Sequence, residues 1–444
     1  MKRSILLLCC LCLSVLCIQA QKRWSLRECI DYAVEHNIEI QQEALKVKNA
    51  EVDLSTSKNS RLPNLSAQID QSFSFGQYTD KITNTNITNN ANGARLTVGT
   101  SMPLFTGFQI PNQVKMDKLN VLAAMEGLNR AKDNMELQVT SLYLEVLFKK
   151  ELKKTYQDQM TLTQKQVEKT ETMVQAGKVP MSQYYDIKAQ LAKDELNVTT
   201  ANNDLDLSLL NLAQALNLSD ASSFDIEEPI IYDVIGENIN SIRPAQDIYQ
   251  TAIVTKPHIK EVEYQIESAK KGVKVAQAGH YPTLTFNAGY ETSIQRLYKA
   301  KNPTWTDQFK DNGKEYVGFT LSVPIFSRFQ VRNKVRAARI TVENNILALD
   351  NVKLSLYKEI QQAHQNATAA QAKFTSTEKA LEAAEEAYRY ADERYQAGKS
   401  TVFELNESQT KLLSSKSEQI QAKYDFLFRA KILDFYRGER IDID

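Results

Sequence analysis

Apolar residues recur at a spacing of seven along two long stretches of the chain. The two series are Val114, Val121, Leu128, Met135 and Leu142, and Val335, Val342, Leu349, Leu356 and Ala363. A sustained seven-residue apolar step keeps one stripe of a helix against a neighbouring helix, which is typical of supercoiled packing. The pattern predicts two long, coiled-coil-like helices.

The distribution of proline favours these helices. No proline occurs between Pro111 and Pro180, and none follows Pro324. Because a proline in a helix interior costs about 3 kcal/mol, such gaps are where long helices can form. A continuous helix from Gln109 to Gln175 would be about 100 Å long, which no compact globular domain needs.

Short motifs return at a constant distance along the chain. The residues "QAGK" occur at 175–178 and at 396–399, and "MPLFTGFQ" at 102–109 matches "VPIFSRFQ" at 323–330. Both pairs are 221 residues apart. The chain is therefore interpreted as an internal duplication.

The duplication sets the expected organisation of the chain. We expect a first structural repeat at 21–220, a connector at 221–243 and a second structural repeat at 244–444. Each repeat should hold a helix, two strands and a helical hairpin, with hairpin tips near 177 and 398. The strands are expected at 63–77 and 94–104, and at 283–295 and 316–326.

In these four segments the apolar period changes from about 3.6 to 2. Leu65, Ala67 and Ile69, for example, alternate with polar residues. A half-buried soluble sheet shows the same alternation. Strands of about ten residues joined by long polar loops are, however, typical of outer-membrane barrels. The aromatic residues near the strand ends fit an interfacial girdle; they are Phe73, Phe75, Tyr290 and Tyr316.

The first twenty residues differ from the rest of the chain. Lys2 and Arg3 precede an apolar run from Ile5 to Ile18, and Ala20 follows. This pattern predicts a secretory signal peptide at 1–20. Four of the five cysteines lie within it, so Cys29 alone is left and no internal disulfide is expected. No later run is apolar enough for a spanning helix.

Composition excludes several classes of function. Charged residues make up 24% and the formal net charge is +0, so nothing indicates a nucleic-acid partner. The four histidines have no metal-ligand spacing, and no glycine-rich phosphate loop occurs. We therefore expect no enzyme, no cofactor and no metal site.

Four spanning strands cannot close a barrel, and an open sheet edge is not tolerated in lipid. The subunit must then associate with copies of itself. Two copies would make an eight-stranded barrel filled by side chains, whereas three would make twelve strands with room for a lumen. The polar faces of the long helices favour the trimer.

The chain resembles TolC-like outer-membrane efflux proteins. The resemblance covers the duplication, the opening "WSLRECIDYAVEHNIEI", the strand-to-helix "PLFTGFQ" and the "AGK" hairpins. It implies a mostly α-helical fold with membrane β: a trimeric periplasmic α-barrel of long helices and a 12-stranded outer-membrane β-barrel. It also implies an exit duct in the outer membrane of a Gram-negative bacterium.

The resemblance implies partners as well. They are a periplasmic adaptor, also called a membrane fusion protein, and an inner-membrane pump of the RND or ABC type. The duct would be a homotrimer in outer-membrane lipid, extending into the periplasm. Small molecules or exported proteins would pass through it.

Site residues follow from the resemblance at the tips of the helical hairpins. Gly177, Lys178, Gly398 and Lys399 would form the turns, where the adaptor docks. The periplasmic gate and its selectivity would rest on Glu404, Glu407, Asp186 and Tyr395. Two positions depart from the family: Ser400 stands where an arginine is usual, and Gln183 where an acidic residue is usual.

Two other functions fit part of the pattern. A secreted coiled-coil adhesin or envelope spacer would account for the heptads but not for four amphipathic strands. A periplasmic adaptor subunit also has a helical hairpin, but it carries only one.

Overall fold

The computed structural model describes residues 23–79, 84, 86–88, 90–221, 223–229, 242–298 and 301–443. The expected signal peptide at 1–20 lies outside the described residues, as does most of the expected connector at 221–243. The chain divides into two compact units. Unit 1 comprises residues up to 45, 126–260 and 350–444, and unit 2 comprises 46–125 and 261–349.

Helices occur in pairs of nearly equal length, one from each half of the chain. The long helices α4 (Gln109–Gln175) and α10 (Gln330–Gln396) both have 67 residues, and α5 (Met181–Ala215) and α11 (Val402–Tyr436) both have 35. The shorter pairs are α2 (Leu26–His36) with α7 (Ala245–Thr255), and α3 (Ile38–Asn59) with α8 (Pro257–Gln277). The 3-10 turn η2 (Ala278–His280) follows α8.

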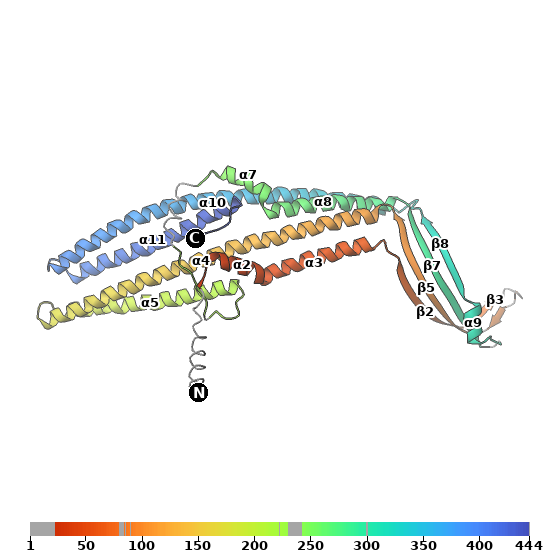
Figure 1. Ribbon diagram of the computed structural model, residues 1–444, viewed down its shortest axis with the longest axis horizontal. Helices are drawn as coiled ribbons and strands as arrows, with labels where there is room; N and C mark the ends of the chain where they lie inside the picture. Colours follow the sequence, from red (N-terminus) through yellow and green to blue (C-terminus); the bar gives the residue numbers. More distant parts are fainter. Residues whose placement is uncertain are drawn as a thin grey trace, which may run out of the picture. The chain divides into compact units, whose positions relative to one another are not determined.

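Unit 1 is mostly helical and contains most of two antiparallel hairpins, α4 with α5 and α10 with α11 (Figure 1). Its apolar core draws on α2, α4, α5, α10 and α11, with Cys29, Tyr143 and Phe426 fully buried. The early helix α2 begins with a capping box, in which Ser25 and Glu28 each bond the other's backbone N–H. Buried apolar surface from both halves of the chain thus holds the hairpins together.

Two short parallel strands also belong to unit 1. They are β1 (Arg23–Trp24) and β6 (Asp225–Ile226). They bring the start of the described chain beside the end of the first half.

Unit 2 contains a four-stranded antiparallel sheet in the order β2-β5-β7-β8 (Figure 1). The strands are β2 (Asn64–Ser74), β5 (Ala91–Thr106), β7 (Thr283–Leu297) and β8 (Lys314–Ser322). In the described part of the chain, β2 pairs only with β5, and β8 pairs only with β7. The sheet therefore has two edge strands, one from each half.

The pairing register sorts the side chains of this sheet onto two faces. One face is mostly apolar and holds the rows Ile69–Leu96–Thr292, Ala67–Val98–Tyr290–Glu315, Leu65–Thr100–Ala288–Val317 and Met102–Phe286–Phe319. The opposite face is mostly polar and holds the rows Asp70–Arg95–Ser293, Gln68–Thr97–Glu291–Lys314 and Ser66–Gly99–Gly289–Tyr316. On the apolar face, Leu65, Val317 and Phe319 are 80%, 73% and 68% exposed.

Several details differ from the sequence expectations. The fourth strand ends at Ser322 rather than 326, since Pro324 has no N–H for a strand ladder. Strand β5 begins at Ala91 because it pairs with the extended β7 as far as Leu297. The expected polar loops contain structure too: the hairpin β3 (Gln77–Thr79) with β4 (Asn86–Thr88), and the short helix α9 (Trp305–Asp311).

Tyr316 does not lie on the apolar face, where an interfacial girdle would place it. It pairs with Gly289 on the polar face, and a Cβ on Gly289 would meet the Tyr316 hydroxyl at 2.7 Å. The neighbouring Gly99 is similarly covered, at 3.2 Å. The two glycines leave the space in which the tyrosine ring lies against the sheet.

Among the described residues, no helix combines the length and the apolarity required to cross a membrane.

Candidate functional site

Both predicted hairpin tips are helix-ending turns of one type. Gly177 has φ +68° and Gly398 has φ +69°. At the first tip the N–H of Lys178 donates to the carbonyl of Met173 at 2.9 Å, and at the second the N–H of Lys399 donates to that of Arg394 at 2.9 Å. Each glycine N–H also donates three residues back, so both turns are Schellman motifs.

The glycines are required by backbone conformation and not by crowding. No atom lies within 4 Å of a Cβ built on Gly177 or Gly398. A left-handed backbone costs an L-residue about 1–2 kcal/mol, whereas glycine adopts it freely. In both lysines it is the backbone amide that satisfies the helix-end carbonyl.

The second tip carries side-chain contacts that hold its two helices together. Thr401 caps α11, because its hydroxyl accepts a hydrogen bond from the N–H of Glu404 at 3.3 Å. The Glu404 carboxylate is 3.2 Å from Arg394, in the last turn of α10. The cation thus lies at a helix C-terminus and the anion at an N-terminus, which both helix dipoles favour.

The first tip lacks these contacts. The residue 221 positions before Thr401 is Pro180, which begins α5 without a side-chain cap. Met173 and Gln183 stand where the second tip has Arg394 and Glu404. The side-chain oxygen of Gln183 is buried and has no hydrogen-bond partner. The two tips therefore have the same backbone turn but differ in the side-chain contacts that hold their helices together.

The other predicted gate residues are not brought together within one chain. Glu407 forms an ion pair with Lys411 on its own helix, at 2.7 Å, and Asp186 is exposed on α5. The hydroxyl groups of Tyr395 and Ser400 are buried without a hydrogen-bond partner. Arg394, which was not among the predicted site residues, is the cation that Glu404 contacts.

A buried polar cluster, also missed from the sequence, joins α4, α5 and α11. The Thr163 hydroxyl donates to Asp194 at 2.6 Å and accepts from the Gln409 amide at 3.1 Å. Gln190 donates to the other oxygen of Asp194 at 2.9 Å. Thr163, Asp194 and Gln409 are at most 2% exposed. Since buried polar groups are costly unless bonded, the cluster specifies how α11 packs against the first hairpin.

A groove of about 510 Å³ lies along the same three helices. Gln190 and Gln409 line it at the polar cluster, and Phe148 and Tyr156 line it farther along α4. The side-chain oxygen of Gln409 is buried without a partner. The groove is open to solvent and lined by both polar and apolar side chains.

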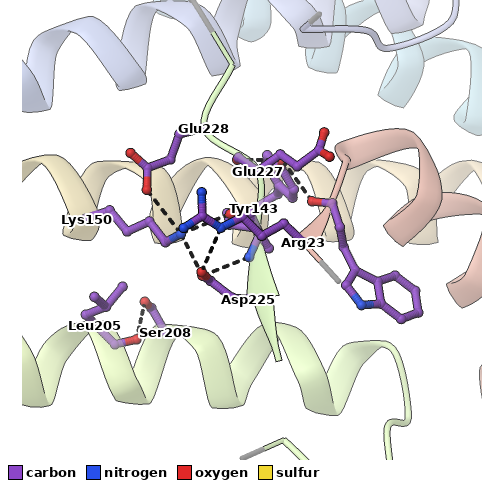
Figure 2. A network of polar contacts seen from close by, with 10 residues as sticks. Arg23, Tyr143, Lys150, Leu205, Ser208, Asp225, Glu227 and Glu228 are labelled. Atoms are coloured by element: carbon purple, nitrogen blue, oxygen red, sulfur yellow. Dashed lines mark hydrogen bonds and ion pairs between the residues drawn. The ribbon is translucent and has the colours of Figure 1, made fainter. Parts of the chain in front are cut away.

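A second polar network fixes the two short strands onto α4 (Figure 2). The Tyr143 hydroxyl is 3.2 Å from the carbonyl oxygen of Trp24 and 2.9 Å from that of Glu227. Lys150 lies seven residues after Tyr143 on α4, and its ammonium nitrogen is 2.6 Å from the carboxylate of Asp225 and 3.3 Å from that of Glu228. These contacts tie the beginning and the end of the first half to one helix.

No group of three or more His, Cys, Asp or Glu residues is placed to hold a metal ion in the part of the chain that the structure describes. The polar clusters described above join helices to one another or join the two short strands to α4. Their geometry is that of structural contacts.

Comparison with known proteins identifies the family to which this chain belongs. The family profile described as "Outer membrane efflux protein" matches residues 29–218 and again 248–438. The chain belongs to this family, which is one of transport channels, and it is an outer-membrane protein. The double match agrees with the internal duplication.

Individual relatives are distant in sequence. The chain is 20% identical to the probable outer membrane lipoprotein SilC of Salmonella typhimurium, over 89% of this chain and 81% of SilC. It is 21% identical to the outer membrane protein TolC of Escherichia coli K12, over 66% of this chain but only 58% of TolC. The solved CmeC outer membrane channel of Campylobacter jejuni has the same fold, with a TM-score of 0.74, 15% identity and coverage of 94% and 87% of the two chains.

Proposed function

We propose that this protein is the outer-membrane exit duct of a tripartite efflux or secretion system. In this role a homotrimer carries small molecules or exported proteins from an inner-membrane pump and a periplasmic adaptor to the outside. Family membership supports the duct, and it disfavours the alternatives of an envelope spacer or an adaptor.

The proposed trimer rests on one observation, the four-stranded sheet of unit 2. One face is apolar and exposed, and the edge strands β2 and β8 are each paired on one side only. Unpaired backbone groups are not tolerated in lipid, so the edges must pair, β8 of one copy with β2 of the next. Three copies give twelve strands and a barrel wide enough for a polar lumen.

The dimensions of the apolar face support a membrane span. Leu284 and Ile294 are ten positions apart on β7, which is about 34 Å at 3.4 Å per residue. At a strand tilt of about 40°, this gives a band about 26 Å tall, close to the usual apolar height of such barrels.

Cell fractionation combined with gel migration of unheated samples tests the duct. We expect the protein in the outer membrane as a heat-sensitive oligomer of three chains. A monomer in the periplasmic fraction would refute the proposal. Deletion of the gene, scored for sensitivity to toxic compounds and for loss of secreted proteins, would then identify the cargo.

We also propose that the hairpin tips form the closed gate and the adaptor docking site. Glu404, Glu407 and Asp186 would form threefold rings of carboxylates, which favour cations in a narrow lumen. The unpartnered Tyr395 hydroxyl, together with Ser400, would bond to a neighbouring copy at the closed tip. Gly177, Lys178, Gly398 and Lys399 would be presented to the adaptor.

Two variants test the gate. The double variant Glu404→Ala/Glu407→Ala should lower the cation selectivity of single channels in planar bilayers, with Asp206→Ala, on the far part of α5, as the control. Tyr395→Phe should raise vancomycin entry into cells, because it removes only the hydroxyl. Wild-type selectivity and wild-type exclusion would place the gate elsewhere.

A further inference from the structure

The short helix α9 lies against the part of β7 that extends beyond Lys314, the first residue of β8. Pairing between β7 and β8 stops at Glu291 and Lys314, yet β7 continues to Leu297. This part of β7 is the end of the sheet joined by the loops, here called the loop end. Without a neighbour, the outward backbone groups of β7 would be unpaired there.

Three side-chain amides take the place of the missing strand. The amide of Asn312 donates to the carbonyl of Ser293 at 2.6 Å, and the Gln308 oxygen accepts from the N–H of Gln295 at 2.7 Å. Asn302 bonds both the N–H and the carbonyl of Leu297, at 2.8 and 2.7 Å. Residues 302–312 are thereby held on the edge of β7 by successive bonds.

The helix lies on the apolar side of the sheet. Thr292, which belongs to the apolar face, is 2% exposed, and its hydroxyl donates to the carbonyl of Phe309 at 2.9 Å. Tyr290, on the same face, reaches the end of the helix: a Cβ on Gly313 would meet its hydroxyl at 2.6 Å. A helix packed on this face points toward whatever the apolar face contacts.

The outer surface of α9 is aromatic on one side. Trp305 and Phe309, four residues apart and so on one side of the helix, are 60% and 43% exposed. Charged residues occupy the other side of α9, among them Asp307 and Lys310. On β7 itself, Arg296 follows Ile294 on the apolar face, so the apolar run of this strand ends there.

We infer that α9 is an interfacial anchor, whose Trp305 and Phe309 insert into the headgroup layer of the outer membrane at the loop end of the sheet. This inference rests on the proposed membrane-spanning role of the sheet. Its partner is a lipid surface because the anchor is continuous with the apolar face and sits at its end. Tryptophan favours this level, since its ring is apolar and its N–H is polar.

The chain has only two tryptophans, which allows a direct measurement. Trp24 packs in unit 1 against Tyr32 and Phe224, so Trp24→Phe retains a ring there and leaves Trp305 as the only indole. This variant would be reconstituted into phosphatidylcholine vesicles with spin-labelled acyl chains. Fluorescence quenching would be compared for labels near the headgroup and labels near the chain end.

We expect the shallow label to quench Trp305 about twofold more strongly than the deep one, as for a residue at headgroup level. Trp305→Phe, which leaves Trp24, should show no quenching by either label. Subtracting the fluorescence of Trp305→Phe from that of the wild type also gives the quenching of Trp305, without altering Trp24. It therefore decides the question if Trp24→Phe does not fold.

Two results in correctly inserted, heat-sensitive trimers would overturn the anchor. Quenching by acrylamide but not by lipid labels would mean that α9 extends into water. Quenching by neither would mean that a second copy of the chain covers it. A wild-type protein that forms no inserted oligomer would instead refute the membrane-spanning role, and the anchor with it.

Discussion

The two hairpin tips have the same backbone and different side-chain supports. Gly177 and Gly398 have φ values within one degree, and the same carbonyls are satisfied around them. Only the second tip has a threonine cap and a cross-helix ion pair, between Arg394 and Glu404. The duplicated turn therefore depends on a single glycine in each half, whereas the side-chain contacts that hold its two helices together differ between the halves.

Farther from the tips, it is the first half that supplies a side-chain contact without a counterpart in the other half. The buried cluster has its carboxylate, Asp194, in the first half and reaches Gln409 of the second. The residue 221 positions after Asp194 is Ser415, which is half-buried, so the carboxylate has no counterpart. The two halves therefore differ at two levels: only the first supplies a buried carboxylate along its hairpin, and only the second has an ion pair and a side-chain cap at its tip. Four predictions test this difference, from the largest expected effect to the smallest.

Replacing the buried carboxylate of the first half should have the largest effect. Asp194→Ala leaves Thr163 and Gln190 without their acceptor, and should lower the free energy of unfolding by about 3 kcal/mol. Ser415→Ala, at the matched position, should change it by less than about 0.5 kcal/mol. Urea unfolding of the detergent-solubilised protein measures both. Equal effects would mean that the cluster is not what distinguishes the halves.

The tip glycines should be equally sensitive. Gly177→Ala and Gly398→Ala each force a left-handed backbone on alanine, at a local cost of about 1–2 kcal/mol. Since neither Cβ would meet an atom, no further strain is expected. Hydrogen exchange of the tip amides should accelerate to the same degree in both variants. A clear difference between them would show that side-chain supports alter even the shared turn.

The helix caps should be unequal. Thr401→Ala removes the bond to the N–H of Glu404 and should destabilise the start of α11 by about 1 kcal/mol. Pro180→Ala removes no side-chain cap from α5, so it should not produce such a loss. Hydrogen exchange in the first turns of α5 and α11 reports each helix separately. Equal protection losses would contradict the proposed asymmetry.

Acid should destabilise unit 1 through the second half. Burial, followed by the nearby Lys256 and Arg130, lowers the pKa of His258 below 6.5, and Asp133 only partly opposes this. Below pH 6.5 the unfolded chain takes up the proton first, so the free energy of unfolding falls until the pH reaches the folded-state pKa. Above pH 6.5 both states are neutral and this term is constant.

The variant His258→Gln should remove that slope. His258 is the second residue of α8, and the second residue of the paired helix α3 is Glu39, which is exposed and cannot produce the same effect. Unfolding measured between neutral and mildly acid pH compares the two proteins. An unchanged slope in His258→Gln would assign the acid sensitivity to other groups.

Strong local signals were enough to predict much of the fold. The proline-free, heptad-patterned stretches became α4 and α10, and the repeated glycines became matched turns. Alternation located four strands, which register then sorted onto an apolar and a polar face. These features depend on backbone conformation and residue period, both of which are local.

The site was less predictable. Asp194 and Thr163 look like residues of a solvated helix face, and they are buried where α4, α5 and α11 pack together. Arg394 was missed because its partner lies across the turn, although a basic last turn facing an acidic first turn could have indicated it. Helix α9 was expected to be loop, since its amides bond to an edge of β7 that no local pattern reveals.

By itself, the sequence determined the duplication, the long helices, their glycine turns and the amphipathic strands. Only the tertiary structure decided which polar side chains meet, which face of β7 carries α9, and that the two tips are pinned differently. The physical reason is the separation along the chain of the residues that specify each feature. A helix, a turn or a strand is specified by neighbours within a few residues. A contact between elements instead needs separate segments to pack together, whether they lie 10 residues apart, as for Arg394 and Glu404, or 246 apart, as for Thr163 and Gln409.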